Sequence, residues 1–239
     1  MIIDVHAHVV PGVDDGAVDM AASLEMLRRM HAQGVEAVVC TSHSSIDMEK
    51  YHANFAQLQT AAAQAGVPVR VYPGCEVACG MLWMDIILRQ SREGYLPMMN
   101  GTDCILAEFA PYMRTEEMLH CVRRLREEGG RQVLIAHAER YRALQEDPAA
   151  VQQLLDAGAM IQLNAYSLVL EEDARIRTLA RRLIDERKVT MLGSDAHDTC
   201  RRPPQLTEGE AYIREHCDAA YAEAIIRGNA QAMLACTAQ

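Results

Sequence analysis

Short apolar runs alternate along the chain with longer segments in which apolar residues recur at helical spacing. Met20, Leu24, Leu27 and Met30 have this spacing before Gly34, which predicts a helix that ends at the glycine. The apolar runs predict seven strands, at residues 1–5, 35–40, 69–72, 104–107, 132–136, 160–163 and 189–193. A predicted helix follows each strand, so we expect the strands to pair in parallel under a helical cover.

The regular alternation of strand and helix predicts an α/β protein whose strands form a closed or nearly closed barrel. The chain has 239 residues, of which 50% are hydrophobic, enough for one large core. We therefore expect residues 1–239 to form a single domain. The alternative is an open doubly wound sheet, but no phosphate-binding Gly-x-Gly-x-x-Gly follows the first predicted strand.

Histidines and carboxylates stand where the predicted strands end. His6 and His8 lie on one face of the first strand, because side chains alternate along a strand. The residues at the strand ends are His6, His8, His43, Glu76, Glu108, His137, Asp195 and His197, with Asp14 and Asp15 in the first loop. The carboxyl ends of parallel barrel strands face one mouth, where barrel active sites are built.

So many ionisable side chains in one place would repel one another, or stay desolvated, unless cations lay among them. Mixed imidazole and carboxylate ligands suit manganese, zinc or iron better than magnesium or calcium alone. The number of ligands predicts two or three divalent metal ions that share a bridging carboxylate. Such ions activate a bridging water and clamp the oxygens of a phosphoryl group, which favours hydrolysis of a phosphate ester.

The composition of the chain limits the kinds of partner that we expect it to bind. A net charge of −10 and a pI near 5.4 argue against nucleic acid as the main partner. No apolar run approaches the roughly 18 residues of a membrane span, and no signal segment opens the chain, so a cytoplasmic protein that is not embedded in a membrane is expected. The eight cysteines include no Cys-x-x-Cys pair, which predicts free thiols.

The motifs at the strand ends occur together in a known group of proteins. Asp-x-His-x-His at residues 4–8, Thr-Ser-His at 41–43, Gly-x-Glu at 74–76, Ala-His-x-Glu-Arg at 136–140 and Ser-Asp-x-His at 194–197 resemble the polymerase-and-histidinol-phosphatase (PHP) superfamily. Pro-Gly-Val-Asp-Asp-Gly at 11–16 and Arg-Pro-Pro at 202–204 are similar to one branch of it. That branch is the bacterial manganese-dependent protein-tyrosine phosphatases of capsule and exopolysaccharide gene clusters.

The resemblance implies a distorted seven-stranded (β/α) barrel with a trinuclear metal site, in which we expect manganese, with iron or zinc as alternatives. It assigns His6, His8, Glu76 and Asp195 to one ion, Glu76, Glu108 and His137 to a second, and Asp15, His43 and His197 to a third. Asp15 matches the ligand position, with Asp14 beside it. Arg140 and Arg202 would bind the phosphate and stabilise charge in the transition state. Asp4 would orient an imidazole.

The resemblance also implies a substrate, namely the phosphotyrosine tail of a bacterial tyrosine autokinase that controls polysaccharide synthesis. The expected mechanism is in-line attack by a metal-bridging hydroxide. Alternatives are a small-molecule phosphatase such as histidinol-phosphatase, a metal-dependent amidohydrolase, and a non-catalytic regulator of the kinase. Amidohydrolases often bridge their metals through a modified lysine, but neither Lys50 nor Lys188 stands at a predicted strand end.

Overall fold

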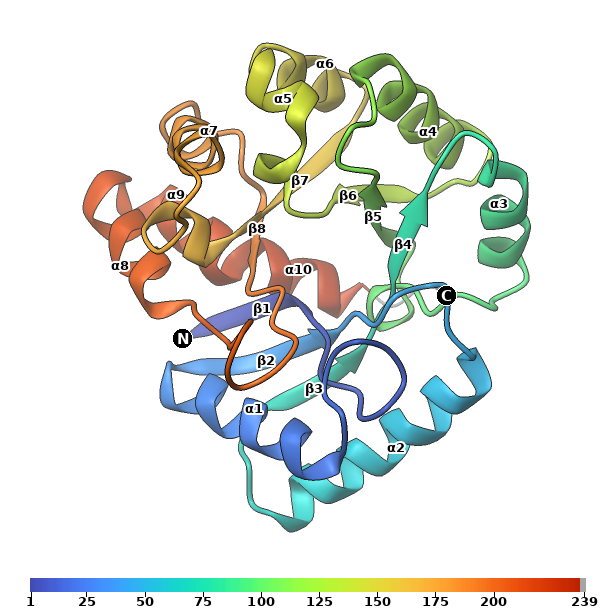
Figure 1. Ribbon diagram of the computed structural model, residues 1–239, viewed down its shortest axis with the longest axis vertical. Coiled ribbons are helices and arrows are strands. Elements are labelled where there is room, and N and C mark those ends of the chain that lie inside the picture. The colour runs from blue at the N-terminus through green and yellow to red at the C-terminus, as the bar shows by residue number, and fades with distance from the viewer. Residues whose placement is uncertain (237–239) are drawn as a thin grey trace.

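Eight parallel strands form two sheets in the computed structural model, which describes residues 1–236 (Figure 1). The smaller sheet has the order β1 (Ile2–Ala7), β2 (Val35–Cys40), β3 (Arg70–Pro73). The larger sheet has the order β4 (Glu76–Cys79), β5 (Cys104–Phe109), β6 (Gln132–Ile135), β7 (Ala159–Asn164), β8 (Met191–Gly193). The predicted α/β class with parallel strands is confirmed.

The predicted number of strands is wrong, because the chain breaks after β3 and starts a further strand, β4, at Glu76. Gly74 makes the break possible, since a Cβ atom there would lie 2.6 Å from Cγ1 of Val39. The Tyr51 hydroxyl holds the turn, accepting from the Gly74 amide at 3.0 Å and donating to a β2 carbonyl at 2.9 Å. The pairing is thus that of two sheets and not of one continuous seven-stranded barrel.

Hydrogen bonds join the two sheets at two places, one beside this break and one between the ends of β1 and β8. Next to the break, the Glu76 amide donates to the Ser42 carbonyl at 3.0 Å, so β4 starts against the segment that follows β2. On the far side, the Asp195 amide donates to the His6 carbonyl at 2.7 Å, which joins β8 to β1. These bonds bring strand ends from both sheets to one place.

Asp4 strengthens the junction of β1 and β8. Its buried carboxylate accepts from the Ser194 amide at 2.9 Å, from the Ser194 hydroxyl at 2.6 Å and from the His6 amide at 3.1 Å. The prediction that Asp4 orients an imidazole ring is therefore wrong, because its partners are a hydroxyl and two backbone amides. It fixes the backbone that carries His6 and Asp195 instead.

Helices cover the strands on the outside (Figure 1). They are α1 (Met20–Ala32), α2 (Met48–Gln64), α3 (Met84–Arg92), α4 (Thr115–Glu127), α5 (Arg142–Glu146), α6 (Ala150–Asp156), α7 (Ala174–Asp185), α8 (Thr207–His216), α9 (Ala219–Glu223) and α10 (Asn229–Ala235). In α1, Met26, Leu27 and Met30 are fully buried, and each such side chain contributes about 2 kcal/mol of hydrophobic stabilisation. Asp19 caps this helix by accepting from the Ala22 amide at 2.9 Å.

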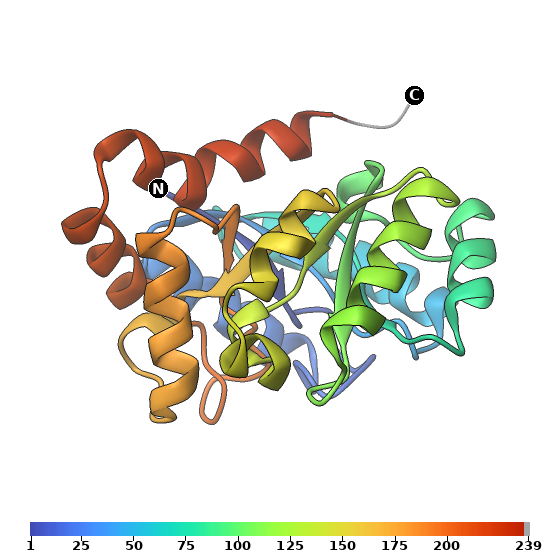
Figure 2. The ribbon, with the colours of Figure 1, turned by 90° about the horizontal axis from the view of Figure 1, so that it is seen from above.

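The last helix closes the amino ends of the strands. Figure 2 shows α10 lying across one side of the molecule, away from the loops that follow β1, β5 and β8. Asn229 at its start donates to the Thr190 carbonyl at 2.9 Å, just before β8, and Asn100 donates to the Leu234 carbonyl at 2.9 Å. The carboxyl ends of the strands are left open for a functional site.

All eight cysteines are free thiols, as predicted, and five of them are buried. Within residues 1–236, none of the helices combines the length and the apolar character that a membrane crossing needs.

Candidate metal centre

The nine side chains predicted as metal ligands come together, eight of them near or after the carboxyl end of a strand and Glu76, against the prediction, at the start of one. His6 lies near the end of β1, Glu76 begins β4, Glu108 lies near the end of β5, and the other six follow strand ends in loops. Four groups have donor atoms that all lie within 4.8 Å of one another: His8, Asp15, His43 and His197; His6, Glu76 and His137; His6, His8 and Asp195; and His43, Glu76 and Glu108. Each group could hold a metal ion, and the groups overlap.

Glu76 lies at the centre of the overlap. One carboxylate oxygen is 3.0 Å from Nε2 of His137 and 3.2 Å from Nε2 of His6. The other oxygen is 3.1 Å from Nδ1 of His43 and 3.4 Å from Nε2 of His8. One buried carboxylate therefore faces four imidazoles, which is the arrangement that a bridging ligand needs.

Asp195 separates the imidazoles from the arginines. Its Oδ1 atom faces His6 and His8 at 3.5 and 3.7 Å, whereas Oδ2 accepts from Arg140 at 3.1 Å and from Arg202 at 2.7 Å. Both predicted catalytic arginines thus contact a predicted metal ligand. Their side chains are 39% and 42% exposed, so they can reach the solvent-facing pocket as well.

The two aspartates of the first loop have different surroundings. Asp15 is 63% exposed, and its Oδ1 atom lies 3.2 Å from Nε2 of His43 and 3.5 Å from Nε2 of His197. Asp14 is buried and pairs with Nδ1 of His8 at 2.8 Å. This geometry favours Asp15 as a ligand and gives Asp14 the role of orienting the His8 ring.

Two amides on β7 connect the centre, and neither is among the residues predicted from the sequence. The Gln162 carbonyl oxygen accepts from the His137 amide at 2.7 Å and faces Nδ1 of His6 at 3.1 Å. The Gln162 amide donates to Asn164 at 2.9 Å, and Asn164 donates to Asp195 at 3.3 Å. The sequence carries a signal for them, since polar residues at alternate positions of an otherwise apolar strand point to one face.

Backbone geometry positions the two arginines. His137 and Asp195 have φ angles of 31° and 53°, in the left-handed region that residues other than glycine seldom adopt. The Arg140 amide donates to the His137 carbonyl at 2.9 Å, so this turn carries Arg140 back over the centre. On the other side, the His197 amide donates to the Arg202 carbonyl at 2.9 Å and closes the loop that presents Arg202.

The buried charges shift one another strongly. Burial lowers the pKa of His6, but the charges of Glu76 and Asp195 outweigh it and raise the pKa to about 9. Burial likewise opposes the bonds from Asp14 and Glu76 that raise the pKa of His8 to about 10. Burial and the neighbouring His8 charge lower the pKa of His197 to about 4. Protons on His6 and His8 therefore balance the carboxylates where no cation does.

The donor atoms fit divalent ions. Among the described residues, Nε2 of His197 is a buried polar atom without a hydrogen-bond partner, although it points towards Asp15. An unpartnered buried nitrogen costs free energy unless something else binds it. Imidazole nitrogens and carboxylate oxygens in overlapping groups are the ligands that manganese, iron and zinc share.

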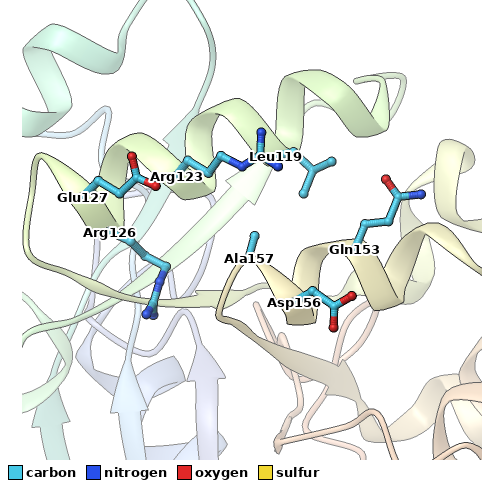
Figure 3. Close-up of a pocket in the computed structure, with 7 residues that line it drawn as sticks. All are labelled: Leu119, Arg123, Arg126, Glu127, Gln153, Asp156 and Ala157. Carbon is cyan, nitrogen blue, oxygen red and sulfur yellow. The ribbon is translucent and has the colours of Figure 1, made fainter.

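A pocket of about 370 Å³ opens over the centre. Polar groups of His43, Glu76, Glu108, His137, Arg140, Asp195 and Arg202 line it together with Phe109, Pro111, Tyr141 and Ile176. A larger hollow of about 640 Å³ lies between α4 and α6, where Figure 3 shows Arg123, Arg126, Glu127 and Asp156 around it. Among residues 1–236, no histidine or cysteine lines this hollow, and Arg126 donates to the Gly158 carbonyl at 2.8 Å. The smaller pocket is the functional candidate.

Parallel strands whose ends carry overlapping groups of imidazoles and carboxylates define an α/β protein with a candidate site for divalent metal ions in an open pocket. The chain belongs to the CpsB/CapC family of capsular polysaccharide synthesis, whose model matches residues 2–235. The family predicted from the motifs is therefore confirmed.

Named relatives agree with this membership. The tyrosine-protein phosphatase YwqE of Bacillus subtilis is 31% identical over 206 residues, which are 82% of this chain and 78% of YwqE. The tyrosine-protein phosphatase CpsB of Streptococcus agalactiae is 26% identical over 243 residues and 98% of each chain.

Solved structures agree with the fold. One matching chain comes from the crystal structures of YwqE from Bacillus subtilis and CpsB from Streptococcus pneumoniae, which are described as unique metal-dependent tyrosine phosphatases. The match has a TM-score of 0.85 and a sequence identity of 27%. It covers 99% of this chain and 96% of the other. The phosphotriesterase of Mycobacterium tuberculosis shares the fold, with a TM-score of 0.61 and 12% identity. The match covers 98% of this chain and 94% of the phosphotriesterase.

We predict that metal binding releases protons. His6 and His8 carry raised pKa values without a cation, so both are protonated at neutral pH and must lose a proton to bind a metal. The affinity for Mn²⁺ should rise about tenfold per pH unit for each proton released. Calorimetry of Mn²⁺ binding in buffers of different ionisation enthalpy measures the number of protons released. His31→Gln is the control, because His31 lies on the exposed side of α1 and its loss should leave that number unchanged. A binding heat that does not depend on the buffer would contradict the prediction.

We predict that Gln162→Leu weakens metal binding about tenfold to a hundredfold, because it frees the His6 ring and the His137 backbone. Titration with Mn²⁺ followed by metal analysis measures the change, and circular dichroism checks that the variant folds. Gln152→Leu, on the exposed face of α6, is the matched control. Equal affinities in the folded variant and the wild type would refute the positioning role.

Proposed function

We propose that this protein is a metal-dependent phosphoric monoester hydrolase that removes phosphate from phosphotyrosine in a protein substrate. The observation that carries the proposal is the pocket in which two arginines meet overlapping groups of metal-binding side chains. The relatives YwqE and CpsB are named tyrosine-protein phosphatases, which supports the choice of phosphotyrosine. We propose the phosphotyrosine tail of a bacterial tyrosine autokinase, which regulates capsule or exopolysaccharide synthesis, as the substrate.

The proposed ligands are the nine predicted side chains, with Glu76 as the bridge. They are His6, His8, Asp15, His43, Glu76, Glu108, His137, Asp195 and His197. We propose two or three divalent ions, with manganese as the native metal. Bound there, the ions would supply Lewis acidity and make water a nucleophile at neutral pH.

The chain's own residues bind and orient the phosphate. Arg140 and Arg202 carry planar guanidinium groups that suit the oxygens of a phosphoryl group. Both lie at hydrogen-bond distance from Asp195 and both line the pocket, so a small rotation can move either one towards a bound phosphate. Donors that already surround the phosphate stabilise the charge that builds up during transfer.

The apolar walls of the pocket suit an aromatic leaving group. Phe109, Pro111, Tyr141 and Ile176 line the pocket together with the polar groups. Tyr141 is fixed in place, because its hydroxyl accepts from the Phe109 amide at 3.0 Å. A phenyl ring can contact these walls while its phosphate reaches the arginines.

Two other chemistries fit the pocket less well. An amidohydrolase bridge through a modified lysine has no candidate, since Lys188 pairs with Glu186 at 2.6 Å and Lys50 lies on the exposed side of α2. A thiolate nucleophile is not supported either, because no cysteine of the described residues lines the pocket. Burial also raises the pKa of the Cys104 thiol to about 12.

We further propose that residues 1–239 act as one domain in the cytoplasm. We also propose that the two sheets together serve as one distorted (β/α)7 barrel of the PHP type, in which β3 and β4 are two parts of one interrupted strand. The hydrogen bonds that join β1 to β8, and β4 to the segment after β2, support this proposal.

Phosphate release tests the proposed function. With Mn²⁺ added, we expect a phosphotyrosine peptide to be hydrolysed faster than histidinol phosphate, and we expect EDTA or His137→Ala to abolish the activity, since both remove metal. Preference for histidinol phosphate would instead identify a small-molecule phosphatase. Release from neither substrate, by protein that contains metal, would refute the hydrolase.

The roles of the arginines are tested separately. We predict that Arg202→Ala lowers kcat about a hundredfold or more without weakening Mn²⁺ binding, because the arginine stabilises the transition state and is not a ligand. Arg201→Ala is the matched control, since Arg201 is the exposed neighbour in the same loop. A parallel loss of metal and activity in Arg202→Ala would show that this residue supports only Asp195.

A further inference from the structure

An apolar groove of about 360 Å³ lies beside the mouth of the pocket. Its walls are Met81, Leu82, Trp83, Ala110, Tyr112 and Met113, with Gly80 and Glu117 at the edge. Leu82 is 90% exposed, Tyr112 78% and Trp83 59%. We refer to this surface as the Trp83 groove.

Exposure of these side chains is unusual for this chain. It has one tryptophan, two phenylalanines and eight tyrosines, and most of its large apolar residues are buried. Tryptophan, tyrosine and methionine are the residues that protein interfaces favour over the rest of a surface. An exposed apolar patch rimmed by polar residues marks a place where another molecule binds.

The Trp83 groove is continuous with the pocket through one loop. Phe109 and Pro111 line the pocket, whereas Ala110, Tyr112 and Met113 line the groove. The other wall follows β4, the strand that starts with Glu76. A polypeptide whose phosphotyrosine enters the pocket can reach the groove with a nearby residue, since residues 109–113 line both surfaces and β4 and β5 are neighbouring strands.

We propose that the Trp83 groove binds an apolar side chain of the substrate polypeptide, close in sequence to the phosphotyrosine. The inference rests on the proposed phosphotyrosine activity and adds a determinant of peptide preference to it. The occupant is apolar because six of the eight lining residues are apolar or aromatic, and Glu117, the charged one, already pairs with Arg114 at 3.2 Å. A volume near 360 Å³ is at the small end of ligand pockets, which suits one or two side chains.

Two peptides test the proposal. The first has one phosphotyrosine among glycine and serine residues. The second is the same except that leucines stand two and three residues before and after the phosphotyrosine. We expect the wild type with Mn²⁺ to favour the leucine peptide in kcat/KM. Tyr112→Ser and Leu82→Ser should each lower the ratio of the two kcat/KM values about tenfold, because residues at the centre of an interface contribute that much to binding. Turnover of p-nitrophenyl phosphate, which is too small to reach the groove, should not change.

Tyr95→Ser is the matched control, because Tyr95 is also exposed, at 44%, but follows the far end of α3. Equal kcat/KM values of the wild type for the two peptides would overturn the proposal, and so would an equal loss on all substrates in Tyr112→Ser. A wild-type dimer that Leu82→Ser converts to a monomer would assign the groove to a second copy of the chain.

Binding distinguishes failure of the groove from failure of the catalytic proposal. Trp83 is the only tryptophan of the chain, so its fluorescence reports on the groove. Peptides that carry a phosphonate in place of the phosphate cannot be hydrolysed, and we expect the leucine version alone to shift the Trp83 emission. A shift without hydrolysis of the phosphotyrosine peptides would refute only the catalytic proposal, whereas hydrolysis without a shift would refute only the groove.

Discussion

The burial of carboxylates and imidazoles together is the constraint on which the rest of this structure depends. Glu76 and Asp195 are almost completely buried, and an unpaired buried charge would cost several kcal/mol. His6 and His8 supply the positive charge when protonated, which explains why the carboxylates raise their pKa values against the effect of burial. A divalent cation can take over this task, so protons and metals compete for one set of atoms.

The break between β3 and β4 serves the same constraint. Beyond β3 the chain keeps its parallel pairing with the segment that follows β2, since Pro73 pairs with Cys40 and Glu76 with His43. Gly74 lets the chain approach Val39 closely at the break, and the Glu76 backbone then bonds with Ser42 and Ser44. The carboxylate then reaches His43, His6 and His137, which come from both sheets. The split of the sheet thereby gives one carboxylate access to ligands on either side.

The sequence predicted well what depends on local patterns. Strand and helix alternation indicated the α/β class, and ligand-type residues at strand ends indicated the nine side chains that the structure brings together. Prediction failed where contacts are distant in sequence. Asp4 was assigned to an imidazole, but its partner Ser194 lies 190 positions away. Gln162 was missed because its contacts, His6 and the His137 amide, come from other strands. The strand after Gly74 was missed because the close approach that requires the glycine is to Val39, on a neighbouring strand.

Asp195 links the candidate metal ligands to the two arginines. A divalent ion held by Asp195 would withdraw negative charge from the carboxylate and weaken its hold on Arg140 and Arg202. The arginines would then be freer to bind the phosphate of the proposed substrate. Without a bound cation, both guanidinium groups contact Asp195. Burial raises the pKa of the Asp195 carboxyl, but the nearby charges of His6, His137 and Arg202 lower this pKa by more, so the carboxylate remains ionised. The same contact keeps the arginines near the centre and would make them available once a cation was bound.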